Sequence, residues 1–137
     1  KIKNNIMKFV QLRTDHPHVT LKVSATCNPF NIYYLDELYD FFKEINVPID
    51  IHLIQIPECY DIRILPDAVK QAITNKHKHR EDLAHVLTFL NSKMYNAELY
   101  LKDFIYITKG TDKIRKEKFG DVMPEYDAVL RKNGINI

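Results

Sequence analysis

The chain has 137 residues, of which 45% are hydrophobic and 28% are charged, as expected for a single globular domain. Its three glycines and six prolines exclude collagen-like and low-complexity proteins. The formal net charge of +2 is too balanced to indicate nucleic acid or an anionic membrane as a partner.

The sequence also predicts the cellular compartment. No stretch approaches the roughly 18–20 apolar residues that span a bilayer, and residues 1–13 lack the apolar core of a secretory signal. Two cysteines, Cys27 and Cys59, are too few for a disulfide-stapled secreted scaffold. We therefore expect a cytoplasmic protein that keeps its thiols reduced and does not contact a membrane.

The first half of the chain alternates between helix and strand patterns. Apolar residues recur with a period near 3.6 in the helical stretches and with a period of two in the strands, and prolines separate the elements. Two strands joined by a helix form a βαβ unit with parallel strands. In chain order, the predicted elements are a helix over 3–13, a strand over 19–26, a helix over 33–45, a strand over 49–56 and a helix over 66–76.

The second half shows only helical patterns. One amphipathic helix is predicted over 83–90, another begins at 99 and is interrupted near Gly110, and a last one covers 124–131. The basic segment from Asn75 to Arg80 (NKHKHR) is the best candidate for a linker. We therefore divide the chain into an α/β portion over 1–76 and a helical portion over 80–137.

The predicted sheet is too small to stand alone. An isolated pair of parallel strands has two open edges and a small core. The chain also begins inside a helical pattern, with apolar residues at Ile2, Ile6 and Phe9. Both observations lead us to expect a piece of a longer protein whose missing strands lie upstream.

One face of the predicted sheet carries polar side chains. Fully packed α/β proteins have apolar residues on both faces of each strand, so a polar face is typical of an open barrel whose wet interior holds a ligand. The alternative is a two-layer sheet with one solvated face, on which Lys22 and Asp50 form a cross-strand ion pair. The polar residues of this face are Lys22, Ser24, Thr26, Asp50 and His52.

The sequence predicts no metal site and no nucleic-acid site. Cys27 and Cys59 cannot complete a zinc or iron–sulfur site alone, and no histidines have the spacing of an HExxH motif. We expect buried structural thiols and solvated histidines. Lysines between 109 and 118 lie near aromatic residues, but interleaved acidic residues favour a solvated helix over RNA stacking.

Specific strings carry a family resemblance. A strand ends at Thr26, a loop holds Asn31, a helix starts with Leu-Asp-Glu-Leu at 35–38, and a second strand ends at Pro57 before Leu65-Pro66 opens the next helix. This segment resembles the C-terminal half of a radical SAM (S-adenosylmethionine) enzyme barrel. The tail is similar to the end of twitch-domain radical SAM proteins. Its matching residues are Phe104, Thr108-Lys109, Asp112, Arg115, Phe119, Asp121 and Pro124-Glu125.

The resemblance implies the C-terminal βαβ portion of a partial (β/α)6 barrel, followed by a helical extension. The parent enzyme would use a four-iron four-sulfur cluster to cleave S-adenosylmethionine to a 5′-deoxyadenosyl radical, which abstracts hydrogen from a substrate. The family's CxxxCxxC cluster motif is absent from this sequence. The chain alone is therefore expected to hold no cofactor and to be non-catalytic, and its partner would be the missing N-terminal half of the barrel.

The resemblance also implies roles for individual residues. Asn31 and Gln55, near the strand ends, would contact S-adenosylmethionine. The helical portion would cap the barrel and recognise a peptide or protein substrate. The residues lining the substrate pocket would be Lys22, Ser24, Asp50 and His52.

Two other interpretations stay open. A stand-alone, non-enzymatic interaction module derived from this fold would cover its sheet edges by oligomerising. A small RNA-associated protein would use segment 75–80 and the tyrosines, and its binding would depend steeply on salt.

Overall fold

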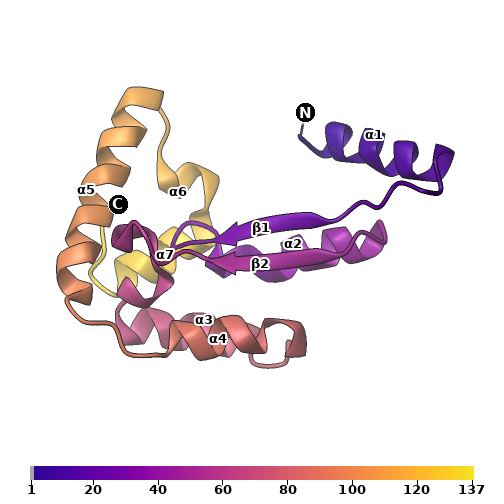
Figure 1. The fold of residues 1–137 in the computed structure, drawn as a ribbon. Coiled ribbons are helices and arrows are strands. Elements are labelled where there is room, and N and C mark those ends of the chain that lie inside the picture. The colour runs from indigo at the N-terminus through magenta and orange to yellow at the C-terminus, as the bar shows by residue number, and fades with distance from the viewer. Residues whose placement is uncertain (1) are drawn as a thin grey trace.

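A computed structural model describes residues 2–137 and shows a mixed helix and sheet protein (Figure 1). Most of the chain is helical, and the described strands form one two-stranded parallel sheet. The strands are β1 (Val23–Cys27) and β2 (Ile49–Leu53). The helices are α1 (Ile2–Asp15), α2 (Leu35–Glu44), α3 (Asp67–His77), α4 (Ala84–Leu90), α5 (Ala97–Arg115), α6 (Phe119–Val122) and α7 (Pro124–Lys132).

The predicted βαβ order is confirmed, but both strands are shorter than predicted. The first rung of the ladder is the N–H of Val23 donating to the carbonyl of Pro48 at 2.8 Å, so residues 19–22 have no partner strand opposite them. The last rung is the N–H of Ile54 donating to the carbonyl of Cys27 at 3.4 Å. Beyond it the chain turns away at Asn28-Pro29, which leaves the end of the predicted second strand unpaired.

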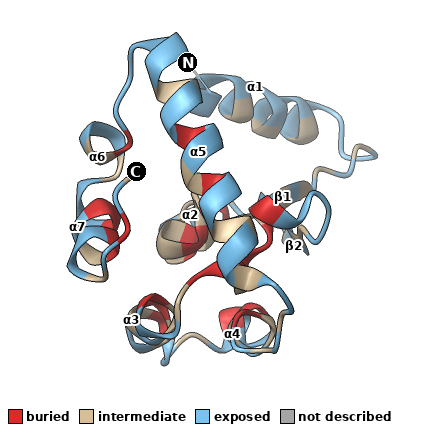
Figure 2. Ribbon diagram, turned by 90° about the vertical axis from the view of Figure 1, so that its left-hand side faces the viewer, coloured by how far each residue is buried: buried red, intermediate tan, exposed pale blue. Residues whose placement is uncertain are grey.

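The sheet has one covered face and one exposed face, as its alternating sequence predicts. Helix α2 packs behind the strands and buries Leu35 and Phe42 (Figures 1 and 2). On the covered face, Cys27 is fully buried against this helix layer. The other residues of this face are half-buried: Val23, Ala25, Ile49, Ile51 and Leu53. On the opposite face every strand residue is exposed.

One core cluster joins the two halves of the chain. It combines residues of the α/β portion, such as Cys27 and Ile73, with residues of the helical portion, such as Leu90, Tyr126 and Leu130. Helix α3 continues to His77, so part of the predicted linker is helical. Helix α5 continues through Gly110, where the sequence predicted an interruption.

Helix α1 stands apart from this core. It lies beside β1, on the side away from β2 (Figure 1), and none of its residues is buried. Two side chains anchor it: the Arg13 guanidinium donates to the carbonyl of Asn46 at 2.6 Å, and the Lys3 ammonium lies 5.1 Å from the centre of the Phe41 ring. Ile2 and Phe9 are 77% and 58% exposed, so α1 presents an apolar stripe without a partner among residues 2–137.

Candidate functional site

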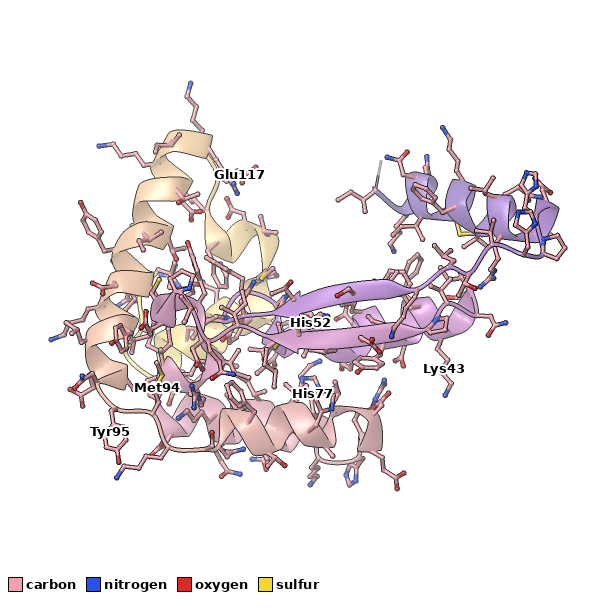
Figure 3. All side chains as sticks on the ribbon, in the orientation of Figure 1. Lys43, His52, His77, Met94, Tyr95 and Glu117 are labelled. Atoms are coloured by element: carbon pink, nitrogen blue, oxygen red, sulfur yellow. The ribbon has the colours of Figure 1, made fainter. Side chains whose placement is uncertain are left out.

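The exposed face of the sheet brings together the predicted substrate-pocket residues. The strand register places Ser24 opposite Asp50 and Thr26 opposite His52, and all four side chains are exposed. Figure 3 shows His52 near the C-terminal end of β2. Lys22 forms an ion pair with Asp50, as the alternative of a two-layer sheet with one solvated face predicted. A ligand on this face would therefore meet two hydroxyls, one imidazole and the ion pair of Lys22 and Asp50.

Asn31 already uses its side chain to hold the turn that follows β1. Its amide nitrogen donates to the carbonyl of Thr26 at 2.8 Å, and its amide oxygen accepts from the N–H of Asn28 at 3.0 Å. These bonds close the strand and start the helical turn before α2. Asn31 can contact a ligand only with the remaining hydrogen-bonding capacity of its amide.

Gln55 lies just beyond β2 and is exposed. No side-chain hydrogen bond of Gln55 is formed within residues 2–137, so its amide is free to bind a ligand. The two predicted cofactor contacts thus differ: Asn31 has a structural task, whereas Gln55 has none.

Both cysteines are buried and free, as predicted. Burial, with a smaller contribution from the nearby Asp61 carboxylate, raises the pKa of Cys27 to about 12. The thiol is therefore protonated at neutral pH and unsuited to be a nucleophile. Within residues 2–137, no group of three or more His, Cys, Asp or Glu side chains is arranged to hold a metal ion.

Sequence reasoning missed a buried ion pair in the loop after β2. Asp61 is fully buried, and its carboxylate accepts from the Arg63 backbone N–H at 2.8 Å and from the Arg63 guanidinium at 2.6 Å and 3.0 Å. The guanidinium also lies 4.3 Å from the centre of the Phe89 ring on α4. An Asp-x-Arg string is common, so only the tertiary structure reveals this cluster, which fixes the loop between β2 and α3.

The prediction of solvated histidines is wrong for His77. This residue ends α3, is 1% exposed, and has its Nε2 atom 3.2 Å from the carbonyl oxygen of Ile32 (Figure 3). Its Nδ1 atom has no hydrogen bond and lies 3.9 Å from a carboxylate oxygen of Asp36, which Lys76 binds at 2.6 Å. Burial lowers the pKa of His77. The basic string around His77 gave no signal for this burial.

The C-terminal residues that carry the family resemblance lie on α5, α6 and α7, and several of them fix how these helices join. The Asp112 carboxylate accepts from the N–H of Phe119 at 2.8 Å and so fixes the turn between α5 and α6. The Thr108 hydroxyl donates to the carbonyl of Phe104 at 2.7 Å inside α5. Phe119 is thereby held against Phe30, in the loop that follows β1, with ring centres 6.2 Å apart.

An apolar groove separates α1 from α2. It has a volume of about 470 Å³, and Asn31 and Met123 lie among its lining residues. Ile2 and Ile6 form one wall, and Phe41 belongs to the other. The groove therefore runs along the apolar stripe of α1, which leaves open apolar surface between α1 and α2.

Comparison with family models, curated proteins and solved structures finds no significant match to this chain. Among the described helices, none has the length and apolar character required to cross a membrane.

Proposed function

We propose that this chain is the C-terminal portion of a radical SAM enzyme barrel and forms part of the wall around S-adenosylmethionine and the substrate. In this proposal β1 and β2 are two neighbouring strands of a partial (β/α)6 barrel, and α3 to α7 form a helical extension of the twitch-domain type. The chain is not catalytic alone. Its two reduced cysteines are consistent with a cytoplasmic location.

One observation carries the proposal: a parallel βαβ unit whose uncovered face is polar and whose edges are open. Because backbone groups alternate in direction along a strand, the N–H and C=O of Ser24 point away from β2. No described segment pairs with them. A strand added at this edge would extend the parallel sheet and satisfy these groups.

Helix α1 supports the same arrangement. A helix that precedes a parallel strand packs over that strand and its neighbour, because the crossover is right-handed. Here α1 lies beside the open edge of β1, and its Ile2 and Phe9 side chains are exposed to solvent. A further strand next to β1 would lie within reach of this stripe and of the apolar groove.

The residues present do not fit the cluster that the family requires. Three cysteine ligands are needed, whereas Cys27 and Cys59 are the chain's only cysteines and both are buried in separate elements. The cluster would belong to the missing N-terminal half. For S-adenosylmethionine the chain offers the free amide of Gln55 and the remaining hydrogen-bonding capacity of Asn31, and for the substrate it offers the exposed side chains of Ser24 and His52.

A matched pair of substitutions tests the proposal in the full product of the gene, reconstituted anaerobically with iron and sulfide. His52→Trp would fill the proposed barrel interior, whereas His85→Trp alters an exposed histidine of α4. We expect 5′-deoxyadenosine formation to fall at least about tenfold with His52→Trp, because a bulky ring displaces the bound ligands. His85→Trp should retain the activity.

Both histidines are exposed, so both variants should unfold at the temperature of the parent protein, and this melting control separates folding from activity. A gene product that assembles no iron–sulfur cluster would overturn the proposal. Equal activity of the two variants would overturn the assignment of the polar face to the interior. A stable homodimer without cluster would support the interaction module instead.

A further inference from the structure

A surface hollow lies between the segment that follows β2 and the middle of α5. Its volume is about 300 Å³. None of its lining residues belongs to the polar face of the sheet. They are Pro57, Glu58, Cys59, Tyr100, Asp103, Tyr106 and Ile107.

The lining of the hollow includes two carboxylates and no basic side chain. Glu58 and Asp103 are both exposed, and neither side chain forms a hydrogen bond or ion pair within residues 2–137. No lysine, arginine or histidine is among the lining residues. Burial raises the pKa of the Cys59 thiol, and the carboxylates of Asp103 and Glu58 raise it further. The interior of the hollow therefore has the potential that attracts a cation.

The other lining residues are aromatic or apolar, and they match the aliphatic stem of a lysine or arginine side chain. Tyr106 is 80% exposed, so its ring is open to a cation, whereas Tyr100 packs partly against the cluster of Cys59 and Phe104. Pro57 and Ile107 are apolar, and Cys59 is 8% exposed at the base of the hollow. An aliphatic stem can pack on these groups while its charged end reaches the carboxylates.

The surface around the hollow favours a macromolecular partner over a small amine. Ile56, directly before Pro57, is 83% exposed, and Leu99, one turn before Asp103 on α5, is 56% exposed. Apolar residues at the rim of a charged hollow are typical of sites that bind an anchor residue together with its neighbours.

We propose that this hollow binds a lysine or arginine side chain of a peptide or protein partner. The ammonium or guanidinium lies between Glu58 and Asp103 and over the Tyr106 ring, and the apolar neighbours of the anchor residue contact Ile56 and Leu99. This binding requires neither S-adenosylmethionine nor an iron–sulfur cluster, so it stands or falls independently of the proposed barrel.

An NMR titration tests the site directly. The ¹⁵N-labelled protein is titrated with the peptide acetyl-Leu-Lys-Leu-amide and with the neutral peptide in which norleucine replaces lysine. We expect saturable shifts at the amides of Cys59, Asp103 and Tyr106 with the lysine peptide only. For a single anchor residue the Kd should be on the order of 1 mM and should rise with salt, because screening weakens exposed charge pairs.

A pair of double variants with the same change in net charge sharpens the test. Glu58→Gln with Asp103→Asn should weaken binding by about three- to tenfold, the effect of removing two exposed charge pairs. Glu44→Gln with Glu98→Gln changes exposed carboxylates on α2 and α5 outside the hollow and should leave the Kd within about twofold.

Four results would overturn the proposal. The norleucine peptide could bind as tightly as the lysine peptide, which would exclude recognition of charge. The Glu58 and Asp103 double variant could bind like the parent protein, or the shifts could map to another surface. Binding of n-butylamine as tight as that of the lysine peptide would assign the hollow to small amines and overturn the peptide partner.

Discussion

The rings of Tyr33 and Tyr126 stack face to face, with centres 5.0 Å apart and planes inclined by 7°. This contact joins α7 to the turn in front of α2. Phe119 meets the Tyr126 ring edge-on at 5.9 Å, and the Tyr126 backbone N–H donates to the Tyr34 hydroxyl at 3.4 Å. The helical portion is therefore held against the α/β portion by aromatic packing in the interior.

The Tyr126 hydroxyl predicts a stabilising substitution. The residue is fully buried, yet its hydroxyl has no hydrogen-bond partner. Tyr126→Phe keeps the ring stack and removes an unsatisfied polar group, so the free energy of unfolding in urea should rise by about 0.5–2 kcal/mol. Tyr95→Phe, at an exposed position, should change it by less than about 0.5 kcal/mol. A loss of stability in Tyr126→Phe would show that the hydroxyl is bonded.

The buried pair between Asp61 and Arg63 predicts a large loss of stability. Removing the carboxylate with Asp61→Ala leaves the partly exposed Arg63 guanidinium without its partner over the Phe89 ring, and we expect a cost of about 1.5–3 kcal/mol. Asp40→Ala is the matched control, because it breaks an exposed ion pair with Arg80. The Asp40 side chain is 62% exposed, so the substitution should cost about 0–1 kcal/mol. Equal urea midpoints for the two variants would contradict the structural importance of Asp61.

Buried His77 predicts a dependence of stability on pH. Its pKa in the folded protein lies below the ordinary value of about 6.5, so below that pH the unfolded chain binds a proton that the folded protein does not. The contribution of neutral His77 to the free energy of unfolding should be fully present above pH 7 and should be lost as the pH falls from 7 to 5. The nearby Asp36 carboxylate opposes this effect, whereas Lys76 and Arg80 reinforce it.

Chemical denaturation at several pH values checks this prediction. His77→Gln should remove most of the loss between pH 7 and 5, whereas His79→Gln, at an exposed position, should retain it. A pH slope that is the same in His77→Gln and in the parent protein would assign the proton uptake to another group.

Two glycines predict opposite effects of the same substitution. A Cβ at Gly120 would lie 2.7 Å from a carboxylate oxygen of Asp127, which binds Arg131, so Gly120→Ala should destabilise the protein by about 1–3 kcal/mol. A Cβ at Gly110 would meet nothing within 4 Å, and Gly110→Ala should stabilise α5 by about 0.5–1 kcal/mol. Thermal unfolding of both variants should shift in opposite directions, and shifts of the same sign would contradict the close contact at Gly120.

The local elements could be predicted from the sequence because their causes are local. Alternation between residues 19 and 26 placed the polar and apolar faces of β1 correctly, and Lys22 and Asp50 pair as the alternation suggested. The strand ends could not be predicted, because they depend on where the partner strand begins and turns away. The continuity of α5 through Gly110 also depends on packing elsewhere in the helix, such as that of the buried Phe104.

The candidate site was predictable only in part, for a related reason. The exposed polar face follows from residue period alone, and the structure confirms it at Ser24 and His52. The burial of Asp61 and His77 depends on residues distant in sequence, such as Ile32, whose carbonyl lies 3.2 Å from the His77 ring nitrogen. The hollow at Glu58 and Asp103 likewise joins two segments that no local pattern connects.

The most direct test of the central claim is to read the coding sequence upstream of Lys1 in its native context. We predict an open frame that continues upstream through further strand and helix patterns and includes a CxxxCxxC motif. An upstream frame that is closed, or one that encodes no cysteine triad, would contradict the assignment of this chain to a radical SAM barrel.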